Sequence, residues 1–375
     1  MGHSEFPDSP LTATSQSYVP RTSTRIRGTN GKPEADAFPQ DDASNGQERR
    51  AGTSVLGMGS ALPPNVVSNA EVAERTGLTE DWIVQRTGIQ ERRHSAPGVR
   101  PSLLGAESAV KAMEQAGVKP EELGFILCTT LTPDTPVPAT ACWIQAEIGA
   151  NRVPAIDLNA ACSGFLYGWK IADALMRSDA SMGPILLVAV EQMSRIVDPT
   201  DPHTCAIFGD GAASVVIGRA EAGFGLLGCT LGADGAGASL IQVPAGGGHL
   251  PASHETVDAG LHYLQMQGRE IFKLAVNEMT GECEALLNEL GIDADEIKLV
   301  VPHQANARIL DSVARHLGVA DRIHVNIAKV GNTVSASIPL ALEECATQGK
   351  LKRGDLVLLT AFGAGLTWGA AVVRW

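Results

Sequence analysis

The stretch AIDLNAACSGFLYGWKIADAL, residues 155–175, runs from a short apolar segment of strand character, through small and polar residues, into an apolar segment with helical spacing. A helix over 163–176 would carry apolar side chains around most of its circumference, which predicts a buried helix. Cys162 would then lie at its amino end, where unpaired N–H groups and the helix dipole stabilise a thiolate. Cys162 is therefore a candidate nucleophile. The alternative is a cysteine that serves as a small buried hydrophobic residue.

The order of segments around this stretch occurs twice along the chain. Strand-like runs at 124–130, 184–192 and 207–218 accompany it in the first half. These runs lack clean alternation, which is typical of strands covered on both faces, and helical segments separate them, so a layered α/β fold is predicted. We predict two duplicated halves, 51–220 and 221–375, with a shared site between them. The second half repeats the order in three segments, residues 297–306, 324–346 and 355–375. A strand is expected at 322–327, at the start of the second of these segments.

Composition narrows the class of protein. The chain has 375 residues and is 44% hydrophobic, which is typical of a globular protein with a large core. Its net charge of −13 disfavours general nucleic-acid binding. No apolar run reaches about 18 residues, so no membrane span is expected. The N-terminus lacks the order of a secretory signal, which favours the cytoplasm.

The seven cysteines are odd in number and widely and irregularly spaced. This pattern fits a reducing compartment and predicts neither disulfides nor a metal site. Residues 1–50 are rich in Ser, Thr, Pro, Gly and charged residues, so we expect a disordered tail. An interaction arm, or a start codon placed too far upstream, is the alternative for this segment.

Two residues of the second half raise Cys162 above the other cysteines. His303 lies between an apolar strand-like run and a helical segment, and Asn332 lies in the junction that corresponds to the one carrying Cys162. Alone, His303 would be read as a satisfied polar residue and Asn332 as a turn or cap residue. Together with Cys162 they make a Cys/His/Asn constellation.

Several separated motifs resemble one known family. DLNAACSGF, VPHQAN, GNTVSASIP, EDWIVQRTGIQERR, IFGDGA and AFGAGLTWG are similar, in order and spacing, to motifs of 3-oxoacyl-[acyl-carrier-protein] synthase III. The resemblance runs from about Thr53 to Trp375. It implies the thiolase fold, a five-layer αβαβα arrangement of two duplicated halves, in a homodimer. It also implies a decarboxylating condensation of an acyl-CoA primer with malonyl-carrier protein, without a cofactor or metal.

The resemblance assigns roles at the reacting centre. Cys162 would accept the primer acyl group as a thioester. His303 and Asn332 would donate hydrogen bonds to the enolate that malonyl-carrier protein forms when it loses carbon dioxide. The backbone N–H groups of Cys162 and Ala364 would stabilise the oxyanion of the tetrahedral intermediates. The N–H of Ala364, where the family often has Gly, serves this purpose if φ there is negative.

The resemblance also assigns the substrate-binding surfaces. It implies a primer pocket that includes Phe208 and Val137, the latter at a position where well-known members carry a Phe that narrows the partner's pocket. Pro202 replaces a basic residue that usually helps to enclose the CoA adenine, and Val334 replaces a usual Ser. The residues implied in CoA binding are Trp82, Arg86 and Asn306, and those implied in carrier-protein docking are Lys273, Arg269, Arg308 and Arg315.

Other functions remain open from the sequence. A starter-unit condensing enzyme or acyltransferase of a natural-product pathway would share these motifs, although Asn332 favours carbon–carbon bond formation. An inactive assembly subunit is a further alternative, which the intact Cys162, His303 and Asn332 disfavour. A thiolase proper would carry a second active-site cysteine near its C-terminus, and the segment AFGAGLTWGAAVVRW, residues 361–375, contains none. The glycine-containing runs at 55–62 and 243–255 are expected to be a first strand and a surface loop rather than nucleotide sites.

Overall fold

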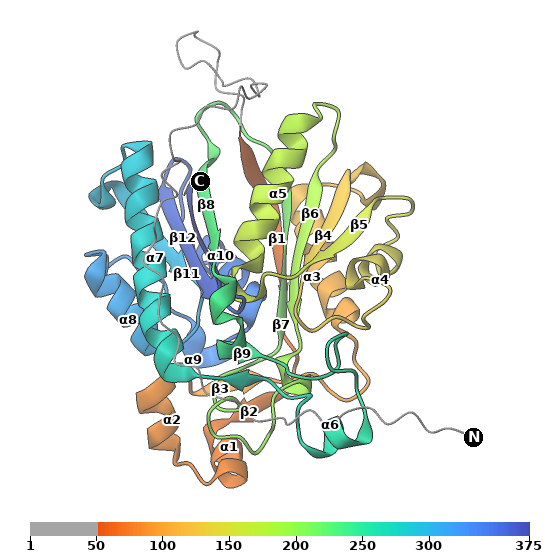
Figure 1. The fold of residues 1–375 in the computed structure, drawn as a ribbon. Coiled ribbons are helices and arrows are strands. Elements are labelled where there is room, and N and C mark those ends of the chain that lie inside the picture. The colour runs from red at the N-terminus through yellow and green to blue at the C-terminus, as the bar shows by residue number, and fades with distance from the viewer. Residues whose placement is uncertain (1–51) are drawn as a thin grey trace, which may run out of the picture. The chain divides into compact units, whose positions relative to one another are not determined.

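The computed structural model describes residues 52–375, in which two mixed β-sheets lie side by side (Figure 1). The tail predicted over 1–50 lies outside the described residues. The first sheet has the strand order β1-β7-β6-β4-β5, with β4 parallel to both neighbours and β7 antiparallel to both of its own. Its strands are β1 (Thr53–Ala61), β4 (Phe125–Thr129), β5 (Ala155–Leu158), β6 (Ile185–Glu191) and β7 (Gly211–Arg219).

The second sheet repeats the parallel and antiparallel arrangement in four strands. Its order is β11-β12-β13-β8, and only β11 and β12 are parallel. The predicted division between residues 220 and 221 falls in the loop between the last strand of the first sheet and the first strand of the second. The strands are β8 (Gly225–Ala233), β11 (Ile297–Pro302), β12 (Leu356–Gly363) and β13 (Thr367–Arg374).

Two helices fill the space between the sheets. α5 (Gly164–Ser178) and α10 (Ser337–Thr347) share one hydrophobic core with strands of both sheets. Within this core Trp169 is 1% exposed, and its Nε1 donates to the Thr53 hydroxyl at 3.2 Å. Helices α3 (Pro101–Ala116) and α4 (Thr140–Glu147) cover the outer face of the first sheet. The buried character expected for the helix after Cys162 is therefore confirmed.

The outer face of the second sheet is covered by α7 (Gly268–Leu290), which packs on β8, β12 and β13, and α8 (Ala307–His316) packs on α7 (Figure 1). Together the layers give the five-layer αβαβα arrangement. The central strand β6 is buried at every residue, as expected for a continuous apolar run covered on both faces. The short elements are α1 (Asn69–Thr76), α2 (Glu80–Thr87), α6 (His254–Asp258), α9 (Ile327–Val330), β2 (Val66–Ser68), β3 (Glu91–Arg93), β9 (Ile241–Gln242) and β10 (Gln265–Met266).

Two local predictions need correction. The strand expected at 322–327 is a single bridge between Ile323 and Val300, because Asn326 turns away to donate its backbone N–H to the Gln304 side chain at 3.0 Å and the short helix α9 follows. The helix expected from residue 163 begins at Gly164, after a 3-10 turn that contains the cysteine itself. Within residues 52–375, no helix is long and apolar enough to cross a membrane. All seven cysteines lie in this part as free thiols.

Candidate active site

A sharply bent turn presents Cys162. The chain leaves β5, passes through the 3-10 turn η2 (Ala161–Ser163) and enters α5. Ala161 has a φ of 44°, which L-residues seldom adopt, and its N–H is held at 3.2 Å by the side-chain oxygen of Asn159. The small side chain at 161 lowers the steric cost of this conformation. The turn directs Cys162 into a cavity between the two halves.

The second half contains the same turn. In η6 (Val334–Ala336), Val334 has a φ of 52° and its N–H is held at 2.9 Å by the side-chain oxygen of Asn332. Counting from the two asparagines, Ser335 is the residue that corresponds to Cys162. The duplication expected at the two junctions is therefore present in the backbone itself. It brings the loop of Asn332 against the loop of the nucleophile.

The cavity brings the three predicted catalytic residues together. It has a volume of about 170 Å³, and Cys162, His303 and Asn332 all line it. His303 and Asn332 are 1% and 5% exposed. Most of the remaining wall is apolar, which provides an environment for an acyl chain. The other residues of the wall include the predicted Phe208, Asn306 and Ala364, together with Leu131, Met193, Ile207, Ile241, Leu264, Met266, Ile271, Phe272 and Phe362.

The imidazole of His303 is uncharged. It follows β11, and its burial lowers the pKa of the ring to about 3, although the backbone carbonyl of Val334 acts in the opposite direction. A ring with this pKa stays neutral until the pH falls to about 3. Its Nδ1 lies 2.6 Å from the Ser337 hydroxyl oxygen. His303 can therefore donate a hydrogen bond to an enolate without handing over a proton readily.

The thiol of Cys162 is protonated in the protein without substrate. Its partial exposure is to the cavity rather than to bulk water, and burial raises its pKa well above the ordinary value. The charge of Glu191 raises it further, whereas its own backbone N–H lowers it. The N–H groups at the helix end thus lower the pKa of Cys162 by less than burial raises it. The thiolate expected from the sequence is therefore not the resting form. Loss of the proton has to accompany attack on the substrate.

Glu191 is a buried carboxylate that joins the two halves at this point. It is 0% exposed at the end of β6, and one of its oxygens accepts from the Leu131 N–H at 3.1 Å and the Thr132 hydroxyl at 2.8 Å. The other oxygen accepts from the Ser335 hydroxyl at 2.6 Å. Burial raises the pKa of Glu191 to about 7, and these hydrogen bonds limit the rise. No sequence motif had singled out this residue.

Gly363, at the end of β12, packs directly against the nucleophile. A Cβ atom at this position would lie 2.7 Å from the Cys162 nitrogen and 2.9 Å from its Cβ. The next residue is Ala364, whose φ is not positive, since the non-glycine residues with positive φ in 52–375 are Arg152, Ala161 and Val334. The condition set for the Ala364 N–H as an oxyanion donor is therefore met.

Replacing Gly363 by alanine is expected to slow acylation of Cys162 on the order of 100-fold, because the added methyl displaces the nucleophile and its N–H, and catalysis is sensitive to displacements of about 1 Å. The rate of acyl transfer to Cys162 in a stopped-flow or quench experiment measures this. Gly281→Ala is the matched control, because no atom lies within 4 Å of the added Cβ at that exposed helix position. Equal rates for the two variants would contradict the close packing.

Asn332 is fixed mainly through its backbone. Its N–H donates to the Ile207 carbonyl at 2.9 Å, and its carbonyl accepts from the Gly209 N–H at 3.0 Å. The intervening residue, Phe208, lies beside it in the cavity wall. The side-chain nitrogen of Asn332 is 3.5 Å from the Ala305 carbonyl, a long contact that leaves a donor for a ligand.

The residues predicted to bind CoA gather at one side of the cavity. Arg86 lies over the ring of Trp82 at 5.6 Å from its centroid, and the backbone carbonyl of Arg86 accepts from the Asn306 side chain at 3.0 Å. Trp82 is 37% exposed. Its ring is thus presented to solvent beside a residue of the cavity wall. Pro202 and His203 lie in the loop between β6 and β7, where Pro202 is half-buried and His203 is exposed.

Three of the four predicted docking cations are next to residues of the cavity wall. Arg308 lies 5.7 Å from the ring centroid of Phe272, which lines the cavity. Lys273 and Arg269 are exposed on the same part of α7. Arg315 lies two turns further along α8 and forms an ion pair of 3.1 Å with an aspartate of its own helix. The structure therefore sets Arg315 apart from the other three.

Val137 does not line the cavity of its own chain. Its side chain is 84% exposed in the loop before α4. The apolar residues that do line the acyl end come from separate segments around 131, 193, 207, 241 and 264–266. Apart from the segment around 207, which is in the IFGDGA motif, they belong to no motif, and the pairing of β9 with β10 brings the last two segments together.

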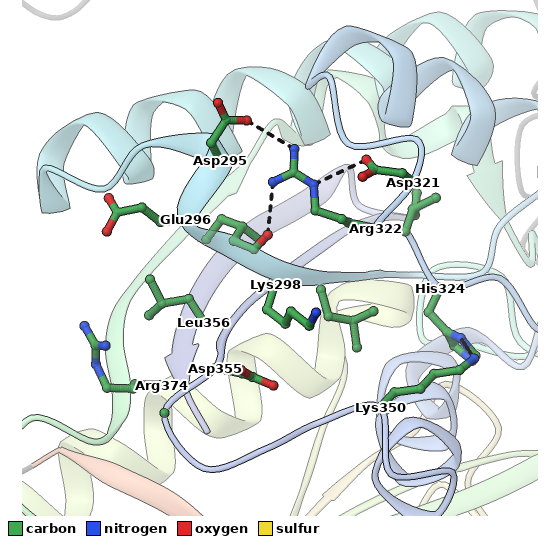
Figure 2. Close-up of a pocket in the computed structure, with 14 residues that line it drawn as sticks. Asp295, Glu296, Lys298, Asp321, Arg322, His324, Lys350, Asp355, Leu356 and Arg374 are labelled. Carbon is green, nitrogen blue, oxygen red and sulfur yellow. Dashed lines mark hydrogen bonds and ion pairs between the residues drawn. The ribbon is translucent and has the colours of Figure 1, made fainter.

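A second, larger hollow of about 910 Å³ lies along the outer edge of β11 (Figure 2). Its wall is charged, and Arg322 there is bound to Asp295 and Asp321, both at 3.3 Å. On the other side, the Lys350 side chain runs to His324 (Figure 2). None of the residues predicted for catalysis or substrate binding lines this hollow.

Comparison with known proteins identifies the family. A family model described as 3-oxoacyl-[acyl-carrier-protein] synthase III matches residues 156–235, and one for its C-terminal part matches residues 287–375. The beta-ketoacyl-[acyl-carrier-protein] synthase III of Caldanaerobacter subterraneus subsp. tengcongensis is 42% identical over 322 residues, which cover 86% of this chain and 97% of that protein.

Two solved structures are similar along the same length. The 3-oxoacyl-[acyl-carrier-protein] synthase III of Aquifex aeolicus VF5 matches with a TM-score of 0.80 and 40% identity, covering 86% of this chain and 100% of that one. The priming beta-ketosynthase of the R1128 polyketide biosynthetic pathway matches with a TM-score of 0.79 and 32% identity, covering 86% and 96%. The resemblance found in the motifs is confirmed. The chain belongs to the 3-oxoacyl-[acyl-carrier-protein] synthase III family and is an acyl-transferring condensing enzyme with the thiolase fold.

Proposed function

We propose that the protein catalyses the decarboxylating condensation of an acyl-CoA primer with malonyl-acyl carrier protein, which initiates fatty acid synthesis through an acyl thioester on Cys162. The observation that carries the proposal is the meeting of Cys162, His303 and Asn332 in the wall of one largely apolar cavity. The substrates bring their own CoA and carrier-protein thioesters, so the reaction calls for no further cofactor or metal. The free thiols of the described residues fit a cytoplasmic, reducing location.

In the first half-reaction the sulfur of Cys162 attacks the carbonyl of the acyl-CoA. The carbon–sulfur bond to CoA breaks, the acyl group stays on Cys162, and the thiol proton leaves with CoA. The oxyanion that forms in between accepts hydrogen bonds from the N–H groups of Cys162 and Ala364. In this way one difficult transfer becomes two easier steps.

In the second half-reaction the malonyl group loses carbon dioxide and leaves an enolate. The enolate oxygen accepts hydrogen bonds from the ring of His303 and the amide of Asn332. The enolate carbon then attacks the acyl carbonyl, the new carbon–carbon bond forms, and the bond to the Cys162 sulfur breaks. The Cys162 thiolate takes up a proton from water, and the product leaves as 3-oxoacyl-carrier protein.

The experiment combines the enzyme with a panel of acyl-CoA primers and malonyl-carrier protein, followed by mass analysis of the carrier. A carrier that bears a 3-oxoacyl group, with carbon dioxide released in equal amount, supports the proposal. A carrier that bears only the primer acyl group indicates simple acyl transfer instead. The similarity to the R1128 priming ketosynthase favours a second candidate, starter-unit condensation in polyketide synthesis, which would show as a preference for an unusual primer.

We propose that the CoA nucleotide binds to Trp82, Arg86 and Asn306. We also propose that an acidic carrier protein docks on a basic surface formed by Arg269, Lys273, Arg308 and Arg315. The chain has a net charge of −13, so a local basic surface is needed to steer an acidic partner. The position of Arg308 next to the cavity wall supports this assignment. Because Arg315 already forms an ion pair within its own helix, we expect it to contribute less than the other three to the binding of the carrier protein.

Reversing the charge of Arg308 with Arg308→Glu is expected to slow condensation with malonyl-carrier protein several-fold, more at low salt than at high salt, and to leave primer acylation from CoA nearly unchanged. The same reversal at Arg315 should have a smaller effect. Lys352→Glu, in the exposed loop before β12, is the matched control. An effect of Arg308→Glu confined to the CoA step would refute the docking surface.

The β5 edge supports a homodimer. Within residues 52–375, β5 is the end strand of the first sheet and pairs only with β4, so its other edge has no partner strand there (Figure 1). Ile156 on this strand is 42% exposed. Pairing of two such edges would remove an open edge and bury part of this apolar surface. Light scattering should give twice the mass of one chain at micromolar concentration, and a monomer would contradict the proposal.

We propose that the primer pocket, including Phe208, admits primers bulkier than acetyl, because Val137 is smaller than a phenylalanine reaching across the dimer. Val137→Phe is expected to reduce the rate with branched four- and five-carbon acyl-CoA about 10- to 200-fold relative to acetyl-CoA, the range for small changes in apolar volume. Competition between the two primers measures this. A wild-type preference for acetyl, or unchanged selectivity in the variant, would remove Val137 from the specificity-determining residues.

A further inference from the structure

Pro302 interrupts the backbone pairing at the outer edge of the second sheet. Among residues 52–375, β11 is an end strand of that sheet, and outside it Ile323 pairs with Val300 in a single parallel bridge. Val300 donates its N–H to the Arg322 carbonyl at 2.8 Å and accepts from the His324 N–H at 2.9 Å. Two residues further on, the same pattern requires an N–H at position 302, which proline lacks. The ladder therefore stops just before the histidine of the cavity.

The side-chain amide of Gln304 takes the place of the missing peptide group. Its Nε2 donates one hydrogen to the Pro302 carbonyl at 2.9 Å and the other to the His324 carbonyl at 3.1 Å. Its Oε1 accepts the Asn326 N–H at 3.0 Å. An amide nitrogen has two hydrogens and here each has its own acceptor, so the three hydrogen bonds exist together. In a continued parallel ladder, the His324 carbonyl and the Asn326 N–H would bond to residue 302 directly.

This amide and the backbone groups that it bonds are buried. Gln304 is 0% exposed, and His324 and Asn326 are 6% and 7% exposed. A buried backbone N–H or carbonyl that loses its partner costs free energy, because water does not replace the hydrogen bond there. Gln304 therefore fixes the start of the loop after β11 to the segment that lies outside the strand.

The loop that Gln304 fixes contacts both side chains that are assigned to the enolate. His303 lies directly between Pro302 and Gln304, the two residues joined by the first of these hydrogen bonds. The carbonyl of Ala305 is 3.5 Å from the side-chain nitrogen of Asn332. A shift of this loop would displace His303 and alter the surroundings of Asn332 at the same time.

We propose that Gln304 is a positioning residue, which holds His303 and, through the Ala305 carbonyl, Asn332 in place for the enolate. Its amide does so by completing the ladder that Pro302 interrupts. The consequence for catalysis rests on the proposed function, in which both side chains donate to the enolate oxygen. The three hydrogen bonds are a property of the free protein and do not depend on the reaction.

Gln304→Met keeps the length of the side chain and removes all three hydrogen bonds. The Asn326 N–H should exchange with deuterium about 5-fold faster, as on loss of one hydrogen bond, which NMR of the free protein measures. Decarboxylation on acylated enzyme should fall on the order of 100-fold, because displacements of about 1 Å at a reacting centre have that effect. The loss should appear in kcat rather than in KM for malonyl-carrier protein, since Gln304 is buried. Acylation of Cys162, in the other half, should change little.

Gln145→Met is the matched control. The Gln145 amide also donates to a backbone carbonyl, that of Val153 at 3.2 Å, but it lies on α4, which covers the outer face of the first sheet. The control variant therefore loses a comparable hydrogen bond away from the cavity, and both of its half-reactions should match those of the wild type.

Gln304→Glu is the conservative variant. A protonated carboxyl still accepts from the backbone N–H and donates to one of the two carbonyls, whereas an ionised one places bare oxygens against both. Burial raises the pKa of a carboxyl, to about 8–9 in extreme cases, so decarboxylation relative to wild type should fall several-fold from pH 7 to 9. The nearby histidines stay neutral in this range, because burial lowers the pKa of His303 to about 3 and also lowers that of His324. Glu344 and Lys350 beside the His324 ring are common to both proteins.

A folded Gln304→Met protein that decarboxylates at the wild-type rate, or in which both half-reactions slow equally, would overturn the proposal. A constant rate ratio for Gln304→Glu between pH 7 and 9 also contradicts it, and this variant decides the question if Gln304→Met does not fold. A wild type that is acylated but releases no carbon dioxide contradicts the proposed function instead. Exchange of the Asn326 N–H then still shows whether Gln304 holds the loop, so the two failures are distinguishable.

Discussion

Cys162→Ala is expected to abolish primer acylation and condensation together. The thiol is the nucleophile that the bent turn of η2 presents to the cavity, and Ser163 on its C-terminal side donates its hydroxyl to the Thr367 carbonyl at 3.1 Å. No other cysteine lines the cavity. Loss of a nucleophile that forms a covalent intermediate removes the pathway itself, so the condensation rate should fall to the background of the uncatalysed reaction. Product formation with a radiolabelled primer measures this.

Cys142→Ala is the control for that variant. Cys142 is exposed on α4 on the outer side of the first sheet, and its removal should leave both half-reactions unchanged. A Cys162→Ala protein that still incorporates primer covalently would show that the nucleophile is misassigned. Because alanine is close in size to cysteine and the site is a cavity wall, the variant should retain the unfolding transition of the wild type.

His303→Ala and Asn332→Ala are expected to slow condensation by about 2.7–4 kcal/mol in barrier, roughly 100- to 1,000-fold, and to spare primer acylation. Both side chains line the cavity wall and are buried where water cannot easily replace their donors. The two half-reactions are measured separately, by CoA release without malonyl-carrier protein and by carbon dioxide release from pre-acylated enzyme. Equal damage to both would point instead to a general role in activating Cys162.

The pH dependence gives a second check on His303. Because burial lowers the pKa of its ring to about 3, the ring stays neutral as the pH falls from 8 to 5. The decarboxylation step should therefore show no loss attributable to His303 in that range. In an unfolded chain the same ring would bind a proton near its ordinary pKa, so its contribution to stability falls only as the pH drops below about 6.5.

The repeated order of segments was enough to predict a layered α/β fold and the meeting of Cys162, His303 and Asn332 in one place. Apolar runs such as 185–190 predict strands covered on both faces. The two corresponding strand-to-helix junctions predict that the loops of Cys162 and Asn332 meet. These features depend on periodicity and order, which a sequence displays directly. The strand predicted at 322–327 failed because the side chain of Gln304, distant in sequence, takes the hydrogen bond that a sheet neighbour would have taken.

The finer features of the site depend on contacts that no single segment reveals. The positive φ angles of Ala161 and Val334 occur at residues that seldom adopt them, so the sequence matches the two junctions but does not reveal their backbone conformation. The raised pKa of Cys162 follows from burial on all sides and from Glu191, which lies on another strand. The apolar wall of the cavity is assembled from five separate segments, of which only the one around Ile207 belongs to a motif.

Intact-mass analysis of the protein in single turnover tests the central claim most directly. After exposure to acyl-CoA, the mass should rise by one acyl group, which peptide mapping places on Cys162. After addition of malonyl-carrier protein that mass should return to the starting value while 3-oxoacyl-carrier protein and carbon dioxide appear in equal amount. An acyl group found on another residue, or one that stays on Cys162 while product accumulates, would contradict the account.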